Sequence, residues 1–108
     1  MVTFGTRASP LALSQCNLVI SKFANLNPSC KVSLKQISTL PDRQLNVNIS
    51  QIGGRALFTK EIDTQLVNGK IDAAIHSLKD VETTLYPNTV IAAVLLREDP
   101  RDCLISTK

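Results

Sequence analysis

The sequence predicts an α/β fold in which a mixed, mainly parallel sheet is flanked by helices. The first observation is the order of patterns along the chain, which runs strand, helix, strand, helix, strand, strand. The second is size, because 108 residues of which 44% are hydrophobic suffice for one core but not for two domains. The third is that three Phe, one Tyr and no Trp leave the core to aliphatic side chains.

The first part of the chain predicts a strand, a turn and an amphipathic helix. Val2 to Gly5 is short and mostly apolar, and from Ala12 to Leu26 apolar residues recur at three- and four-residue steps. Ser9 is a favourable N-cap, and Pro10 suits the first helical position because proline lacks only an N–H that would be unpaired there. We expect this helix to end near Asn27, before a proline.

The middle of the chain predicts a second strand, a long loop and a second helix. Residues 31–37 alternate between polar and apolar side chains, as in a strand with one wet face. Residues 39–56 have no sustained period and contain the pair Gly53-Gly54, so we expect a loop of the functional or mobile kind. A helix is expected from Leu57, and Asn68-Gly69 offers it a left-handed stop.

The last part of the chain predicts further strands. Ile71 to Ile75 has the pattern of a short buried strand, and HSLKD at 76–80 follows at its carboxyl end. Thr89 to Leu96 is a continuous apolar run, which is typical of a strand covered on both faces. Cys103 to Ser106 is a candidate start of another strand.

Composition and charge exclude several function classes. Three widely spaced cysteines and one histidine suggest neither a disulfide framework nor a metal site, so a reducing, cytoplasmic compartment is the simplest interpretation. No signal peptide is visible, and no apolar run approaches the roughly 18 residues of a membrane span. Scarce aromatics and the lack of a Lys/Arg-rich run argue against nucleic acid. Residues 1–60 hold seven basic residues against one acidic, which favours an anionic partner.

Ligands of open α/β sheets bind beyond the carboxyl ends of the strands, where three segments are expected to lie. In the first, Arg7 and Ser9 bring a guanidinium, a hydroxyl and helix N–H groups together, which suits a carboxylate or phosphate; a capped helix with a surface arginine is the alternative. The second is the 39–56 loop, where Gly53-Gly54 lacks the spacing of a phosphate-binding loop. We expect Arg55 to be available to an anion and Phe58 to enter the core.

The third segment is the HSLKD pentapeptide. It delivers a hydroxyl, an ammonium and a carboxylate from Ser77, Lys79 and Asp80. A carboxylate held there can stabilise a cationic intermediate and exchange a proton with it, although a salt-bridged turn would use the same residues. A Ser-His nucleophile pair is disfavoured because adjacent strand side chains point to opposite faces, so we interpret His76 as packed or hydrogen-bonded.

Four segments together resemble the amino-terminal domain of the hydroxymethylbilane synthases, also called porphobilinogen deaminases. They are GTRASPLAL at 5–13, IGGRALFTKEI at 52–62, AIHSLKDV at 74–81 and REDPRD at 97–102. The resemblance implies a transferase of porphyrin and haem biosynthesis that joins four porphobilinogen molecules, with loss of ammonia, into the linear tetrapyrrole hydroxymethylbilane. It also implies three domains, of which residues 1–108 form the first, with two lobes similar to a type II periplasmic binding protein.

Matched motif by motif, the resemblance makes Asp80 the catalytic aspartate. The positions that match substrate- or cofactor-binding residues of the family are Arg7, Ser9, Gln15, Arg55, Phe58, Ser77 and Lys79. The family's dipyrromethane cofactor is covalently attached to a cysteine of the third domain, outside this chain. We therefore expect the 108 residues alone to be inactive and to carry no cofactor.

The resemblance has departures and one rival interpretation. Pro41 and Gln51 stand where the family usually has a glycine and a lysine, so the anion contacts of the loop are expected to differ from the family's. Glu82 replaces a proline that often follows the KDV segment. The full-length family is usually monomeric, whereas we expect this piece to be marginally stable or to self-associate.

The rival interpretation is a non-enzymatic carboxylate-binding lobe of the periplasmic-binding-protein type. In such a lobe the carboxylate of Asp80 would repel the ligand.

Overall fold

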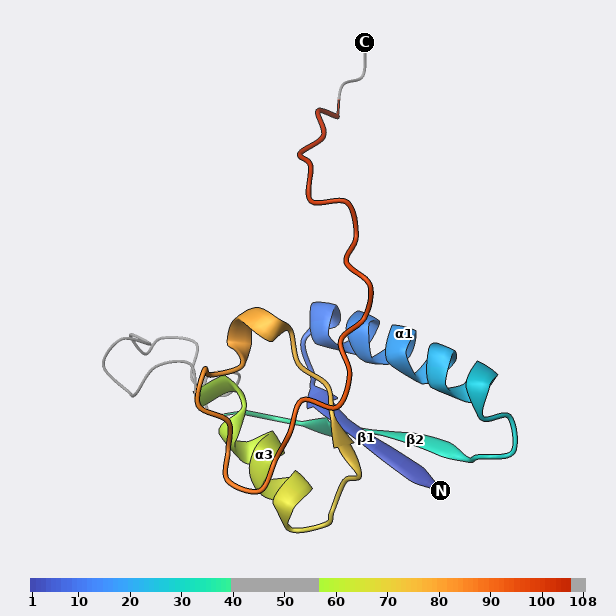
Figure 1. Cartoon of the computed structure of the whole chain (residues 1–108), viewed down its shortest axis with the longest axis vertical. Helices are drawn as coiled ribbons and strands as arrows, with labels where there is room; N and C mark the ends of the chain where they lie inside the picture. Colours follow the sequence, from blue (N-terminus) through green and yellow to red (C-terminus); the bar gives the residue numbers. More distant parts are fainter. Residues whose placement is uncertain (40–56, 106–108) are drawn as a thin grey trace.

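Two helices and three strands follow one another along the chain in a computed structural model, which describes residues 1–39 and 57–105 (Figure 1). In chain order the elements are β1 (Val2–Arg7), α1 (Pro10–Leu26), β2 (Val32–Ile37), α3 (Lys60–Val67), β3 (Ala73–Ala74) and the short 3₁₀ helix η3 (Leu78–Asp80). The α/β prediction is confirmed. None of the described helices has the length and hydrophobicity needed to cross a membrane.

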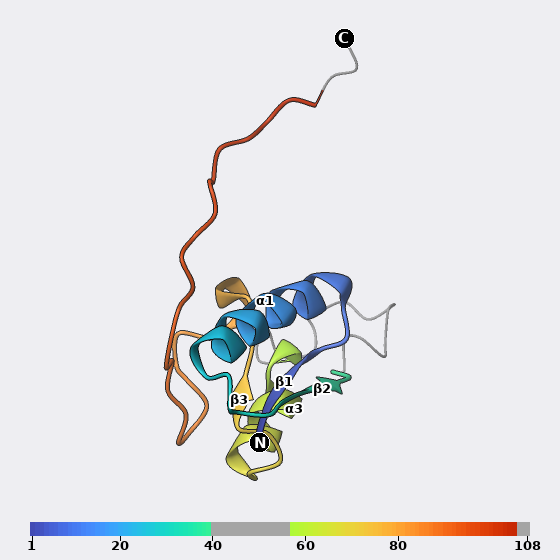
Figure 2. The same ribbon diagram turned by 90° about the vertical axis from the view of Figure 1, so that its right-hand side faces the viewer.

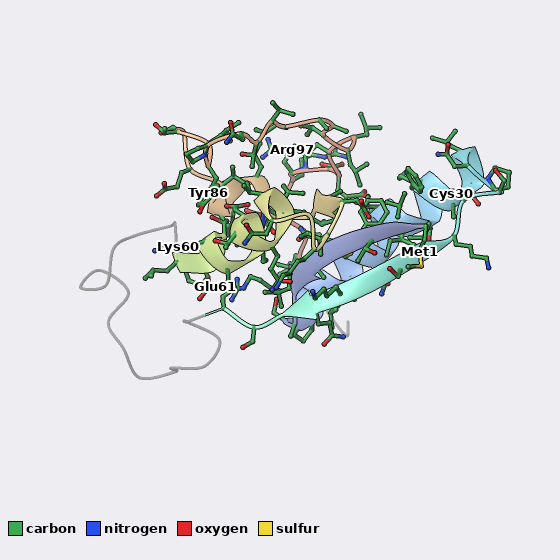
Figure 3. All side chains as sticks on the ribbon, turned by 90° about the horizontal axis from the view of Figure 1, so that it is seen from below. Met1, Cys30, Lys60, Glu61, Tyr86 and Arg97 are labelled. Atoms are coloured by element: carbon green, nitrogen blue, oxygen red, sulfur yellow. The ribbon has the colours of Figure 1, made fainter. Side chains whose placement is uncertain are left out.

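The three described strands form one sheet in the order β2-β1-β3, and both pairings are parallel. Val2 pairs with Val32 at one end of β1, and Arg7 pairs with Ile37 at the other. Figure 3 shows Met1 and Cys30 together at the amino-terminal end of these strands. The antiparallel component expected of a mixed sheet is not seen among the described residues.

The two helices cover opposite faces of the sheet, as Figure 2 shows. Side chains alternate along β1, so Phe4 faces α1 and meets the ring of Phe23 edge to face, with centroids 5.4 Å apart. Gly5 faces the other side, beneath Ile71 and Ile37. The expected aliphatic core lies on that second face, where Ile37 and Ile71 pack with the fully buried Ile62 of α3.

The helix ends follow the predicted capping residues. Ser9 has extended backbone angles, and its Oγ accepts a bond from Ala12 N at 3.4 Å, while Pro10 is the first helical residue. At the other end of α1, Asn27 is the C-cap and its backbone N–H donates to Phe23 O at 2.9 Å. Gly69 follows α3 with φ of 67°, the left-handed conformation expected of it. The predicted start at Leu57 is a separate short turn, and α3 itself begins at Lys60.

The strand β3 is shorter than predicted, with two residues in place of the expected run from Ile71 to Ile75. Asp72 supplies the reason for the late start. Its backbone N–H donates to Thr3 O at 2.9 Å, but the Thr3 N–H donates to the Asp72 side-chain Oδ2 at 2.8 Å. A side chain thus replaces one bond of the backbone ladder, and regular pairing starts one residue later.

The prediction of a strand from Thr89 to Leu96 is wrong for this structure. The segment has no strand conformation and leaves the sheet as an extended tail (Figures 1 and 2). Val90 and Leu96 are 81% and 97% exposed. A strand of this composition needs a neighbouring strand and two covering layers, and the described residues supply neither. Residues 103–105 are likewise exposed and without strand structure, and Ser106 lies outside the described residues.

We predict that Gly5→Ala lowers the free energy of unfolding by about 1–3 kcal/mol, because the added methyl overpacks the core. A Cβ at this position would lie 2.4 Å from Ile71 Cδ1 and 3.1 Å from Ile37 Cδ1. Chemical denaturation measures the change. Ile71→Val deletes the nearer methyl, so it should destabilise the Gly5→Ala protein less than the wild type. Equal effects in both backgrounds would contradict the close contact.

We also predict a large contrast between the cysteines. Cys16 is wholly buried in α1, and burial raises the pKa of its thiol, whereas Cys103 is exposed. Because the thiolate is the reactive form, Cys103 should react with a thiol reagent at least about 100-fold faster than Cys16 in the folded protein. Mass spectrometry of the labelled peptides measures the two rates. Comparable rates in the folded protein would show that Cys16 is accessible.

Candidate active site

The carboxyl ends of β1 and β3 and the beginning of α1 enclose a hollow of about 140 Å³. Parallel pairing brings these strand ends to one edge, as expected for a ligand site in an α/β sheet. Its polar lining comes from Arg7, Ser9, His76, Ser77, Lys79 and Asp80.

Arg7 is the last residue of β1, and its guanidinium lies on the ring of Phe58, with Cζ 4.6 Å from the ring centroid. Stacking of this kind is attractive and uses the face of the guanidinium, whereas the N–H donors lie at its edge. Phe58 also lines the hollow and is only half-buried. The expectation that Phe58 enters the core is therefore corrected, because the side chain packs against Arg7 at the site.

Ser9 places the amino-terminal end of α1 beside Arg7. The helix is 17 residues long and has no acidic residue in its first turn, so the partial positive charge of its N-terminus is not offset locally. The Oγ of Ser9 accepts one of the otherwise unpaired N–H groups. This corner of the hollow is therefore favourable for an anionic group.

Ser77 connects the end of β3 to α1. Its hydroxyl donates to Gln15 Oε1 at 2.8 Å, a bond between residues 62 positions apart. Because this bond occupies the amide oxygen of Gln15, the amide nitrogen is the group that remains to donate to a ligand. Gln15 thus reaches the edge of the site through Ser77 rather than lining the hollow itself.

Lys79 and Asp80 lie on η3, the single turn that follows. Asp80 N donates to Ser77 O at 2.9 Å, which closes the turn. Asp80 is half-buried and Lys79 is exposed. Among the described residues no ion pair joins the two side chains, so the salt-bridged turn is not the arrangement observed.

His76 is packed, in agreement with its interpretation from the sequence. Its Nε2 lies 3.4 Å from Asp63 Oδ1 on α3, and the two side chains are only 12% and 16% exposed. The atoms are within ion-pair distance but are not aligned as a hydrogen bond. The sequence pattern did not single out Asp63, because only the folded chain shows which residue of α3 faces β3.

The structure thus gathers most of the candidate residues at one edge of the sheet. Arg55, Pro41 and Gln51 lie outside the described residues. Glu82 is exposed beyond η3. In the described part of the chain no cluster of His, Cys, Asp and Glu is suited to a metal ion, and no cysteine lines the hollow.

Comparison with known proteins places the chain in a family. Residues 2–108 match the family model described as "Porphobilinogen deaminase, dipyromethane cofactor binding domain". The chain belongs to the porphobilinogen deaminase family. It is 51% identical over 104 residues to the porphobilinogen deaminase of Syntrophomonas wolfei, covering 96% of this chain and 34% of the relative.

Two further porphobilinogen deaminases show the same relation. That of Bacillus subtilis is 45% identical over 105 residues, which cover 97% of this chain and 33% of the relative. That of Rickettsia canadensis is 47% identical over 107 residues, which cover 99% of this chain and 36% of the relative. The chain therefore spans about a third of the length of the curated relatives that it matches.

The lining of the hollow fits a dipyrromethane that carries acidic side groups. Arg7 and Lys79 offer cationic donors to carboxylates, Ser9 and Ser77 offer hydroxyls, and the half-buried Asp80 can accept N–H bonds from pyrrole rings. The volume of about 140 Å³ is below the roughly 300–1,000 Å³ of ordinary ligand pockets.

We predict that Ser9→Ala lowers the free energy of unfolding by about 0.5–2 kcal/mol, because α1 loses its N-cap. Thermal or chemical unfolding measures the loss. The matched control is Ser14→Ala, which removes an exposed hydroxyl from the interior of the same helix and should change the stability by less than about 0.5 kcal/mol. An equal effect of the two substitutions would show that the cap bond contributes nothing.

Proposed function

We propose that this chain is the amino-terminal part of a porphobilinogen deaminase and supplies Asp80 as the catalytic carboxylate for joining porphobilinogen units into hydroxymethylbilane. The observation that carries the proposal is the placement of one half-buried carboxylate, Asp80, in a hollow whose other charged groups are Arg7 and Lys79. A site for carboxylates alone has no use for Asp80, whereas a site for carboxylate-bearing pyrroles uses all three groups.

The chemistry of the condensation explains the need for a carboxylate. The amino group of porphobilinogen leaves in its protonated form: the bond between the methylene carbon and the nitrogen breaks, and the nitrogen takes the bonding electrons and departs as ammonia. The methylene-pyrrole left behind is positively polarised until a carbon of the next ring attacks it and then loses a proton. Asp80 can stabilise the positive charge through the ring N–H groups and transfer protons at its carboxylate oxygens.

The remaining residues of the hollow bind and orient acidic groups. We assign Arg7, Ser9 and the amide nitrogen of Gln15 to the carboxylates of the substrate. Ser77 and Lys79 are assigned to the acetate and propionate groups of the dipyrromethane cofactor, which when bound supplies the primer for chain growth. Phe58 holds the guanidinium of Arg7 from one face and so directs its donors toward the ligand. Arg55 is assigned to an acidic group as well.

The domain arrangement is part of the proposal. Residues 1–108 form the first of three domains of a cytoplasmic enzyme and resemble one lobe of a type II periplasmic binding protein. One observation supports this: the relatives are about three times as long as the chain. The exposed apolar segment 90–96 is consistent with cover from the other domains. The 108 residues alone are inactive and prone to self-association.

The main prediction concerns Asp80 in the full-length enzyme. Asp80→Ala should lower kcat by at least about 1,000-fold, because the developing positive charge loses its partner, while the protein remains folded. Asp80→Glu displaces the carboxylate and should also nearly abolish turnover of porphobilinogen. Glu82→Gln removes an exposed carboxylate two residues away and serves as the matched control, with wild-type turnover expected.

Calorimetric titration distinguishes this proposal from a simple carboxylate-binding lobe. The full-length protein should bind porphobilinogen and should not bind simple dicarboxylates with comparable affinity, because Asp80 repels a ligand that lacks ring N–H donors. Wild-type turnover by Asp80→Ala, or preferential binding of a dicarboxylate, would refute the assignment of Asp80.

A further inference from the structure

The segment between β3 and η3 is attached to a helix on each of its two sides. Adjacent side chains of extended backbone point in opposite directions, and His76 and Ser77 follow this rule. Ser77 donates to Gln15 of α1, and His76 lies against Asp63 of α3. The two contacts lie immediately before η3, which carries Asp80.

The contact between His76 and Asp63 is buried and polar. The His76 Nε2 atom is fully shielded from solvent and has no hydrogen-bond partner among the described residues, although Asp63 Oδ1 lies 3.4 Å away. Burying a polar atom without a bond is unfavourable, and an apolar ring of the same size would avoid the penalty. A histidine is therefore unfavourable at this position unless its Nε2 atom interacts with a neighbouring group.

Asp63 is well placed to hold the imidazole. It lies in the first turn of α3, where the partial positive charge of a helix N-terminus favours a carboxylate. The next residue toward the N-terminus, Ile62, is completely buried in the core, so this turn of the helix is fixed against the sheet. A small closure of the 3.4 Å gap allows an Nε2–H bond to Asp63, which requires the tautomer protonated at Nε2.

We propose that His76 is a positioning residue: its contact with Asp63 holds the segment that leads into η3 against α3 and thereby sets the position of Asp80 in the hollow. The proposal rests on the proposed function for its effect on turnover, but not for its effect on local order. The contact of Ser77 with Gln15 fixes the same segment from the other side. Displacement of a catalytic carboxylate by about 1 Å can lower the rate on the order of 100-fold. Contacts that fix the segment on both sides therefore help to maintain the rate.

The experiment compares variants of the full-length enzyme by hydrogen exchange and by steady-state kinetics. His76→Phe keeps a ring but removes the nitrogen, and His76→Gln keeps an N–H donor. Asp63→Asn removes the charge with little change of shape. Lys70→Gln is the control, because it changes one exposed charge beyond the other end of α3.

We expect His76→Phe and Asp63→Asn to exchange amide hydrogens in the peptide 75–82 at least about tenfold faster than the wild type, with exchange in β1 unchanged. In both variants kcat should fall about 10- to 100-fold while KM changes less than about threefold, because Arg7 and Ser9 remain in place. His76→Gln should recover most of the loss. Combining His76→Phe with Asp63→Asn should add little to either change alone.

Wild-type exchange and kcat in a folded His76→Phe protein would overturn the proposal, as would additive effects in the double variant. If His76→Phe fails to fold, Asp63→Asn takes its place in the test, and wild-type exchange and kcat in that variant would overturn the proposal. His76→Gln, which keeps an N–H donor, then serves as its comparison. A wild-type enzyme that does not consume porphobilinogen would contradict the proposed function. The hydrogen-exchange comparison would still test whether the contact between His76 and Asp63 holds the segment.

Discussion

The parallel pairing of β1 with a strand on each side is the constraint on which the rest of the structure depends. Because β1 is central, its two faces carry two helices, and its side chains alternate between them. Phe4 packs toward α1, and Gly5 makes room for the isoleucines beneath α3. The same pairing brings the carboxyl ends of β1 and β3 to one edge, so a guanidinium and a carboxylate far apart in sequence line one hollow.

The electrostatics of that edge follow from the backbone as much as from the side chains. The N-terminus of α1 and the guanidinium of Arg7 both favour negative charge at one side of the hollow. Asp80 brings a carboxylate to the same hollow from a separate turn, and no ion pair with Lys79 is found in the described ranges to neutralise it. A ligand with both acidic groups and N–H donors is complementary to a site that holds charges of both signs, whereas a simple anion is not.

Local features of the fold were predictable from the sequence because their causes are local. Ser9 and Pro10 specify the start of α1, and Gly69 follows α3 in the conformation that its lack of a side chain allows. The edge of the sheet that carries the site was predictable as well, because ligands of open α/β sheets bind beyond the carboxyl ends of the strands. The family itself is shown by the match over residues 2–108.

The predictions that were wrong, and the contacts that were missed, depend on distant parts of the chain. Residues 89–96 have the composition of a buried strand, but a strand forms only where a partner edge is present, and none lies beside them in the described chain. Phe58 has the spacing of a core residue, yet it lies against Arg7, a contact between residues 51 positions apart that periodicity cannot show. Asp63 is one of several acidic residues in the sequence, and only packing distinguishes it.

The two bonds between Asp72 and Thr3 also determine how far β3 can move along β1. A slip of two residues would keep every side chain on its own face, so hydrophobicity alone does not forbid it. Such a slip would, however, carry the carboxylate of Asp72 away from the Thr3 N–H and move everything after β3 by about 7 Å, twice the rise of a strand residue. Asp72 therefore selects one alignment of the strands, and with it the position at which the chain leaves β3 toward η3 and Asp80.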